Sequence, residues 1–569
     1  MAAARDAGPA ARVTTLSFDP ARVPFSRAGA WMALTLLTEE VWGRVGFKGA
    51  PRLALRVLHG DAPDYGRAID LTPLYDGDCR YEADAERLRI VADTGVIEFA
   101  FRDARTLVVS GEGLGLRLEA SQVIWYDNLQ PDGPDGWTWM ASAFRSEFKL
   151  RALSGQIAAD APWTGMRADH IRVYAGGDGL PWVLEIGETW WRASEPAPIP
   201  HSWADWLARI PAVPAEWEAA RQLAAYVGWS ALVEPQGHFT RPAMLMSKNW
   251  MASVWSWDHC FNALALAPID AGLAWDQYRL PFDLQASDGR LPDQANDRRL
   301  FWNFVKPPVH GWTLRRLIET GVVSDEKLAW IYSRLAAWTE WWMRDRGGDA
   351  GLPFYRHGND SGWDNATPFK IGMPVAGPDL AAMLVIQMDV LGEVAAGLGR
   401  LDEAEAWRAR ADTLLARLIE RLWTGETFVA RRVSDGAVHA SDSLVAVIPI
   451  ILGERLPAAI LAALVAKIGE PGRFLCSAGL ATEALTSPQH ESDGYWRGPV
   501  WAPTTLLVVE GLRAVGERAL AHDIARRFCE TCARSGMAEN FDAVTRAPLR
   551  DHAYSWTASV FLLLAASLR

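Results

Sequence analysis

The stretch Pro378–Trp423, PDLAAMLVIQMDVLGEVAAGLGRLDEAEAWRARADTLLARLIERLW, has helical periodicity almost from end to end. Its apolar residues recur every three or four positions, as in helices with a buried face. The same pattern continues through the C-terminal half of the chain, at 216–232, 258–267, 310–320, 325–345, 456–468, 500–515, 517–534 and 553–568. Long loops rich in Gly, Trp and Asp join these stretches. We therefore expect helices paired around a ring, with the loops at one rim, where functional residues usually lie.

Residues 1–195 have a different pattern, in which short alternating or apolar segments are separated by Gly, Asp and Pro clusters. The expected strands are Val13–Phe18, Trp31–Leu36, Leu53–Val57, Leu88–Ala92, Val96–Phe101, Leu107–Val109, Leu114–Leu118, Ile171–Tyr174 and Trp182–Ile186. This spacing is typical of a β-sandwich. The stretch 196–225 is rich in proline, which interrupts regular structure and marks domain borders. The sequence thus predicts a multidomain chain: a β-sandwich at 1–195, a linker at 196–225 and an all-α domain at 226–569.

Charge and hydropathy exclude several classes of protein. The 569 residues carry a net charge of -12 and no basic stripe, so a nucleic-acid partner is not expected. The N-terminal segment lacks the apolar core of a secretory signal, and no apolar run is expected to span a membrane, which takes about 18 residues. We therefore expect a cytoplasmic protein with no membrane partner. The sequence leaves the oligomeric state open.

The cysteines do not indicate a disulfide framework or a metal site. There are five, and Cys529 and Cys532 form a lone CxxC inside a helical pattern with no further ligand pair nearby. Because structural zinc needs four ligands, we expect reduced thiols instead. The Asp-rich loops leave a calcium ion open as an alternative, although they have no EF-hand spacing. No nucleotide-binding glycine loop is present either, so no cofactor is expected.

Tryptophan is unusually abundant, with 29 copies, many of them beside Gly, Asp, Asn or Arg in polar loops. An indole offers a flat apolar face and one hydrogen-bond donor, which suits a sugar ring. The alternative is that these side chains fill space between the layers of a large helical domain.

Two carboxylates stand out as candidates for acid–base chemistry. Cleavage of a glycosidic bond needs a proton donor for the leaving oxygen and a second carboxylate that acts as base or nucleophile. Asp364 lies in the loop HGNDSGWDN (357–365), where the neighbouring indole of Trp363 would raise its pKa. Glu539 lies in AENFD (538–542), just before the last helical stretch. The alternatives are that Asp360 and Asp364 are turn or cap residues and that Glu539 is an ordinary surface or capping glutamate.

Further loop residues are candidates for sugar binding. The segment GYWRGPVW (494–501) combines aromatic rings and a guanidinium in a turn, unless Arg497 only ties the loop down by ion pairs. Asp258 in WSWDH (255–259) would accept sugar hydroxyls or cap the helix that follows. His310 in KPPVHGW (306–312) is expected to be structural. The candidate binding residues are Trp255, Trp257, Asp258, Gln294, Trp363, Tyr495, Trp496, Arg497 and Trp501.

The ordered set WSWDH, KPPVHGW, SGWDN, GYWRGPVW and AENFD resembles glycoside hydrolase family 63 and the related trehalase family, over about residues 240–569. The resemblance implies an (α/α)6 barrel and hydrolysis, with inversion, of an α-linked glucosyl or mannosyl unit. It assigns Asp364 as general acid, Glu539 as general base, and Trp496 and Arg497 to the sugar pocket. The chain departs from the family pattern after SGWDN, with ATPF at 366–369, and after AENFD, with AVTR at 543–546. Both departures bear on the substrate more than on the chemistry.

An inverting enzyme holds its two carboxyl groups about 6.5–9.5 Å apart to leave room for water, whereas about 5 Å would indicate retention. We expect exo action on a short oligosaccharide or glycoside. The alternatives are a glycoside phosphorylase, which would replace the base with a phosphate site, and a carbohydrate-binding protein without activity. A barrel epimerase is disfavoured, because such enzymes usually pair two histidines and histidine is sparse here.

Overall fold

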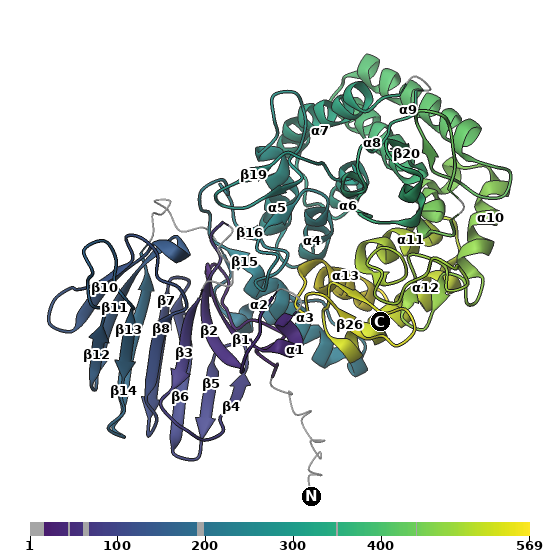
Figure 1. Cartoon of the computed structure of the whole chain (residues 1–569). Helices are drawn as coiled ribbons and strands as arrows, with labels where there is room; N and C mark the ends of the chain where they lie inside the picture. The colour runs from purple at the N-terminus through teal and green to yellow at the C-terminus, as the bar shows by residue number, and fades with distance from the viewer. Residues whose placement is uncertain (1–15, 44–45, 61–67, 190–198, 349–350, 440) are drawn as a thin grey trace, which may run out of the picture.

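The computed structural model of the chain describes residues 16–43, 46–60, 68–189, 199–348, 351–439 and 441–569. The first three residues of the strand expected at Val13–Phe18 lie outside this part. Strands dominate the first third of the chain and helices the remainder (Figure 1). The predicted change from a sheet-rich to a helical region is therefore confirmed.

Two antiparallel sheets form the N-terminal part. The first has the order β1 (Met32–Leu37), β2 (Arg52–Val57), β3 (Ile69–Pro73), β8 (Leu116–Ala120), β13 (Arg172–Ala175) and β12 (Ile157–Asp160). The second has the order β4 (Arg80–Ala83), β5 (Leu88–Ala92), β6 (Gly95–Asp103), β7 (Thr106–Glu112), β14 (Trp182–Glu188), β11 (Ser146–Ser154), β10 (Gly136–Ala141) and β9 (Asn128–Pro131). Alternate residues point inward, so Trp182, Leu184 and Ile186 of β14 are buried. The inward residues of both sheets share one core, so the sheets face each other.

The principal helical elements are α3 (Glu218–Ala231), α4 (Asp258–Leu266), α5 (Ala271–Asp283), α6 (His310–Glu319), α7 (Asp325–Asp345), α8 (Pro378–Gly397), α9 (Leu401–Leu422), the 3-10 segment η7 (Leu444–Arg455), α10 (Ala458–Gly469), α11 (Ala502–Ala514), α12 (Arg518–Ser535) and α13 (Ser555–Ala566). In the described part of the chain, α4, α6, α8, η7, α11 and α13 contact one another in this order, and α13 returns to α4. The other six pack outside this closed inner ring (Figure 1). The amphipathic pattern explains the outer layer, because α9 buries Trp407, Leu414 and Leu418 and exposes its charged face.

Two expectations need correction. The helix α5 and the segment η7 were not predicted. Contrary to expectation, α8 is long and apolar enough to cross a membrane, but 78% of its apolar window is buried inside the protein. Its place in the inner ring makes it a core helix.

The two parts of the chain meet in a polar junction. The Nζ of Lys248, after β16 (Ala243–Met244), donates hydrogen bonds to Ser26 Oγ at 3.0 Å and to the Ala30 carbonyl at 2.5 Å. The Arg105 guanidinium of the sheet domain pairs with Glu234. Buried polar groups that are paired in this way fix one relative orientation of the two parts.

Candidate functional site

Loops collect at the mouth of the ring where the inner helices begin. Asp258 and His310 are the first residues of α4 and α6, and Trp501 directly precedes α11. Two small sheets tie these loops together. One joins β17 (Val254–Trp255), β18 (Gln294–Ala295) and β19 (Leu300–Phe301), and the other joins β24 (Val500–Trp501), β25 (Asn540–Phe541) and β26 (Pro548–Leu549). The second sheet places the GYWRGPVW segment beside AENFD, which follows it by some forty residues.

Asp364 lies just beyond the 3-10 turn η5 (Gly358–Ser361) and does not cap it. The turn is held by Asp360, which accepts hydrogen bonds from the backbone N–H groups of Val305 at 3.1 Å and Arg356 at 2.9 Å. The Asp364 side chain is 31% exposed and its Oδ1 is 3.9 Å from Lys306 Nζ. Burial raises the pKa of Asp364, and the Lys306 charge partly offsets this rise.

Lys306 stands at the centre of a carboxylate cluster. Its ammonium is 3.2 Å from Asp293 and donates a hydrogen bond to the Asn359 carbonyl at 2.8 Å. Burial alone would lower the pKa of Lys306, but the charges of Asp364 and Asp293 outweigh burial and raise it. Burial also raises the pKa of Asp258 to about 8. Asp258 Oδ2 is buried without a hydrogen-bond partner among the described residues, so it is free to meet a ligand hydroxyl.

Glu539 is 4% exposed and directly precedes β25. Its backbone N–H donates to the Asp551 carbonyl at 2.7 Å. Burial, followed by the negative charge of Asp551, raises the pKa of Glu539 to about 8, and the Arg550 charge opposes the rise. A carboxyl in this environment keeps its proton near neutral pH and exchanges it readily at slightly alkaline pH.

Tyr495 connects the two candidate carboxyls. Its hydroxyl lies within reach of Asp364 and of Glu539 and can donate its one proton to either carboxylate, and this contact lowers the pKa of each. The backbone of Tyr495 is left-handed, with φ of 63°. Such a conformation is uncommon for a bulky residue and is held only where the surroundings demand it. The structure therefore brings Asp364 and Glu539 to the same mouth, on either side of one phenol.

Most predicted tryptophans lie beneath this surface. Trp363, Trp496 and Trp501 are each at most 1% exposed. The rings of Trp496 and Trp501 stack with centroids 3.9 Å apart, and the ring of Trp363 packs at 5.1 Å from Trp496. Trp257 is also buried and packs 6.4 Å from Trp496. In this structure the four indoles support the loops that carry the carboxyls, which favours the space-filling alternative for these positions.

The remaining predicted residues lie nearer the opening. Trp255 and Gln294 are partly exposed and face each other across the β17–β18 pair. Arg497 is 21% exposed and pairs with Glu491 at 2.7 Å, as the structural alternative expected. His310 is buried, its Nε2 hydrogen-bonds with the Ser256 carbonyl at 3.0 Å, and burial lowers its pKa to about 4. A buried neutral imidazole of this kind fits the structural role expected for it.

Sequence reasoning missed two groups and undervalued a third. Tyr554, just before α13, is buried beside Glu539 and Asp258, whose charges add to burial in raising its pKa. Asp551 supports Glu539, and Lys306 entered the sequence analysis only as the first residue of KPPVHGW. A signal for Lys306 existed, because a lysine before two prolines in a loop between helices is held rigidly. No local pattern marked Asp551 or Tyr554.

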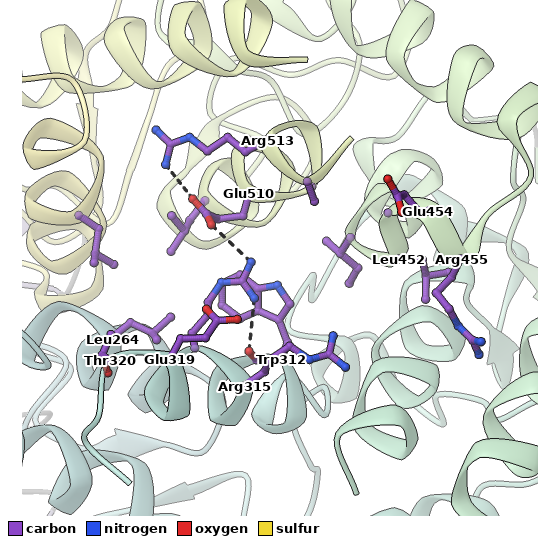
Figure 2. Close-up of a pocket in the computed structure, with 17 residues that line it drawn as sticks. Leu264, Trp312, Arg315, Glu319, Thr320, Leu452, Glu454, Arg455, Glu510 and Arg513 are labelled. Atoms are coloured by element: carbon purple, nitrogen blue, oxygen red, sulfur yellow. Dashed lines mark hydrogen bonds and ion pairs between the residues drawn. The ribbon is translucent and has the colours of Figure 1, made fainter. Parts of the chain in front are cut away.

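A separate cavity of about 800 Å³ opens at the opposite mouth of the ring. Figure 2 shows its lining, including Leu264, Glu319 and Arg455 from the C-terminal ends of inner elements. There Glu510 pairs with both Arg316 and Arg513. Neither Asp364 nor Glu539 lines this cavity, so it is distinct from the candidate site.

The helical part of the chain is similar to known glycoside hydrolases. A family model described as the mannosylglycerate hydrolase MGH1-like glycoside hydrolase domain matches residues 251–557. A mannosylglycerate hydrolase of Rubrobacter radiotolerans is 24% identical over 420 residues, which are 57% of this chain and 92% of that protein.

Two solved structures show the likeness of fold. A family 63 mannosylglycerate hydrolase from Thermus thermophilus, in complex with Tris and D-glycerate, matches with a TM-score of 0.53 and 22% identity. That match covers 60% of this chain and 99% of the Thermus chain. A bacterial glucoamylase complexed with acarbose matches with a TM-score of 0.60 and 9% identity, over 99% of this chain and 96% of the glucoamylase. The sheet-rich part therefore recurs in the glucoamylase match and extends beyond the Thermus match.

Proposed function

Because this chain belongs to glycoside hydrolase family 63, through its mannosylglycerate hydrolase MGH1-like domain, we propose that it is an inverting, exo-acting hydrolase of a short α-linked glucoside or mannoside. The helical ring is then an (α/α)6 barrel at 226–569, joined by the linker 196–225 to a β-sandwich at 1–195. We further propose a cytoplasmic location, which is in keeping with five free thiols.

The observation that carries the proposal is the pair of carboxyls bridged by Tyr495 at one mouth of the ring. In the proposed reaction Asp364 protonates the glycosidic oxygen of the leaving group. A water molecule attacks the anomeric carbon from the opposite face and passes a proton to Glu539. The bond to the leaving oxygen breaks as the bond to water forms, which inverts the configuration. This mechanism requires a separation of about 6.5–9.5 Å between the two carboxyls, which leaves room for the water molecule.

The substrate is proposed to be a hexosylglycerate, with glucose or mannose as the sugar. The named relatives are mannosylglycerate hydrolases, and one solved neighbour holds D-glycerate. The Asp258 oxygen without a partner supports a sugar contact at that position. Trp255 and Gln294, at the opening, are the predicted binding residues best placed to touch a small glycoside. No cofactor takes part in the proposed reaction.

The test is release of free hexose from mannosylglycerate, glucosylglycerate and α-linked disaccharides. Wild type, Asp364→Asn and Glu539→Gln are compared, together with the anomeric form of the first product by proton NMR. We expect turnover of one glycerate, inversion, and a loss of at least about 100-fold in both variants. Activity that requires phosphate would support a phosphorylase instead. Binding of a hexosylglycerate without any product would support a carbohydrate-binding protein.

A further inference from the structure

We infer that the N-terminal sheet domain positions the proposed general base, through a path of hydrogen bonds that runs from Arg56 to Asn249, then to Asp551 and Glu539. This inference rests on the proposed function, because it takes Glu539 as the base. It assigns Arg56 and Asn249 as positioning residues, and it gives the sheet domain a part in the chemistry of the helical domain.

The path begins in strand β2. Arg56 is 2% exposed, and its guanidinium lies over the Trp42 ring at 4.7 Å. One of its terminal nitrogens donates to the Lys248 carbonyl at 3.0 Å, and the other donates to the Asn249 carbonyl. Because both acceptors are adjacent backbone carbonyls, this guanidinium fixes the course of the chain at 248–249. A buried cation in such a place has no water to replace these bonds.

The path continues through the side chain of Asn249, which is fully buried. Its Nδ2 donates to Asp551 Oδ1 at 2.9 Å and to the Arg22 carbonyl at 3.1 Å. Arg22 belongs to the N-terminal part of the chain, so that part holds Asn249 at both its backbone and its carboxamide. The backbone N–H of Ala553 donates to the same Asp551 oxygen at 2.9 Å. Burial raises the pKa of Asp551, and these donors oppose the rise, so they orient the carboxylate and favour its ionised form.

Asp551 acts on Glu539 through its backbone and its charge. Its carbonyl accepts the Glu539 N–H at 2.7 Å, which sets the backbone of the base. Its charge, after burial, is the next cause that raises the pKa of Glu539, and its own backbone N–H opposes that rise. Among the described residues, the other titratable groups that face this pair are Arg550, Tyr495 and Tyr554, with Asp258 beside Tyr554. Ser247 and Trp250 give further hydrogen bonds to Asp551, and all of these residues belong to the helical domain. The sheet domain thus reaches the base through Asn249 and Asp551.

The path starts outside the part of the chain that the family model describes. The family match begins at residue 251, after Asn249. A match to 60% of this chain already covers 99% of the Thermus hydrolase. Arg56 and Arg22 lie in the sequence that precedes the family match.

The direction of the expected Glu539 pKa shift follows from the hydrogen bond between Asn249 and Asp551. Loss of the Asn249 donor disfavours ionised Asp551, so the Asp551 pKa rises and less negative charge faces Glu539. The Glu539 pKa then falls. We therefore expect Asn249→Leu to move the Glu539 titration to lower pH by about 0.5–1 unit. Arg56→Met should act in the same direction, because it releases the backbone at 248–249 that holds Asn249. Arg56→Lys keeps the positive charge and can donate to one of the two backbone carbonyls, so it should shift the Glu539 titration less than Arg56→Met does.

The experiment measures kcat/KM against pH for hexosylglycerate hydrolysis by the full-length variants. In parallel, infrared spectra follow the ionisation of the Glu539 carboxyl without turnover. In each background, the Glu539 signal is the difference between the protein with Glu539 and the same protein carrying Glu539→Gln. The matched control is Arg105→Met, which breaks the ion pair with Glu234 at the same junction but lies off the path. We expect this control to lose thermal stability while the Glu539 titration stays in place.

An unshifted Glu539 titration in both Asn249→Leu and Arg56→Met would overturn the inference. So would an equal shift in Arg105→Met, because it would show that any loosening of the junction has the same effect. Infrared shifts without turnover on any substrate would reject the proposed function and leave the path in place. Turnover with unshifted infrared titrations would reject the path alone.

Discussion

Asp364 and Glu539 have neighbouring charges that act in opposite directions. Burial raises the pKa of both carboxyls. The Lys306 charge opposes the rise at Asp364, whereas the Asp551 charge adds to burial at Glu539, whose pKa is raised to about 8. The proposed roles need a protonated Asp364 and an ionised Glu539, so burial favours the proposed state of the acid and disfavours that of the base. Transfer of a proton between the two carboxyls leaves the net charge of the pair unchanged.

The protonation of this pair predicts the pH dependence of hydrolysis. The active pair carries one proton, so kcat/KM should follow a bell-shaped pH profile. Its acidic limb marks protonation of the second carboxyl. Its alkaline limb, near pH 8, marks loss of the last proton of the pair. Measurement of kcat/KM from about pH 4.5 to 10 checks this. A flat profile across that range would show that neither carboxyl limits the reaction.

The Tyr495 hydroxyl should tune both carboxyls, because its hydrogen bonds lower both pKa values. In Tyr495→Phe the alkaline limb should move to higher pH. We expect kcat/KM to fall about 10- to 100-fold, the equivalent of one hydrogen bond to a charged group. The control is Tyr332→Phe, which removes a hydroxyl bonded to Glu403 on the outer helices. Equal pH profiles for wild type and Tyr495→Phe would contradict the bridging role.

At this scale the sequence predicted residues that lie far apart in the chain and meet in the fold. Ordered motifs pointed to Asp364 and Glu539 as the carboxyls and to Tyr495 as a sugar-binding residue, and the structure gathers all three at one mouth. The indoles of Trp363 and Trp496 were expected to meet sugar, but they are buried. Sequence composition cannot separate the two cases, because an indole among polar loop residues packs under a loop as readily as on it. Asp551 was missed because its partners are remote in sequence.

At the scale of elements, periodicity predicted the helices that have a clear apolar face or a long apolar run. It missed α5, which contains Pro281, and η7, where an unbroken apolar run with Pro449 adopts 3-10 geometry. Two short strands were missed because they also lack a clear apolar pattern. Strands β9 and β12 lie at sheet edges, where half of their residues are exposed and the sequence alternates weakly between apolar and polar residues.

The close approach of inner elements predicts a sharp contrast between two glycines of the ring. A Cβ on Gly311 of α6 would lie 2.5 Å from the Gln387 backbone in α8, so Gly311→Ala must push two inner helices apart. We expect a loss of about 1–3 kcal/mol in the free energy of unfolding. Gly397 ends α8 in open space, so Gly397→Ala should be neutral or stabilising. Calorimetric unfolding of both variants checks this, and equal midpoints would contradict the packing argument.

At the scale of the whole molecule, a second buried contact joins the sheets to the rim of the ring. His59, just after β2, hydrogen-bonds through Nδ1 with Asp297 and through Nε2 with Glu188, each at 2.9 Å. Asp297 lies in the β18–β19 turn of the helical domain, and Arg298 approaches it at 3.4 Å. The imidazole also stacks on Trp31 at 4.8 Å. The junction therefore carries a charge that can be removed by raising the pH.

Burial alone would lower the pKa of His59, but the charges and hydrogen bonds of Glu188 and Asp297 raise it to about 9. A raised pKa means that the folded protein binds the proton more tightly than the unfolded chain does. The resulting stabilisation, on the order of 3 kcal/mol, is complete below the unfolded pKa near 6.5 and is lost as the pH rises through 9. We expect the melting temperature of wild type to exceed that of His59→Gln by most at about pH 6, and the difference to shrink by about pH 9.5.

His170→Gln serves as the control, because His170 also contacts two carboxylates but lies at the surface of the sheet domain. It should change the melting temperature little at any pH, since exposed pairs contribute little. A His59→Gln difference that stays constant from about pH 6 to 9.5 would show that the imidazole acts at the junction by packing on Trp31, without its charge.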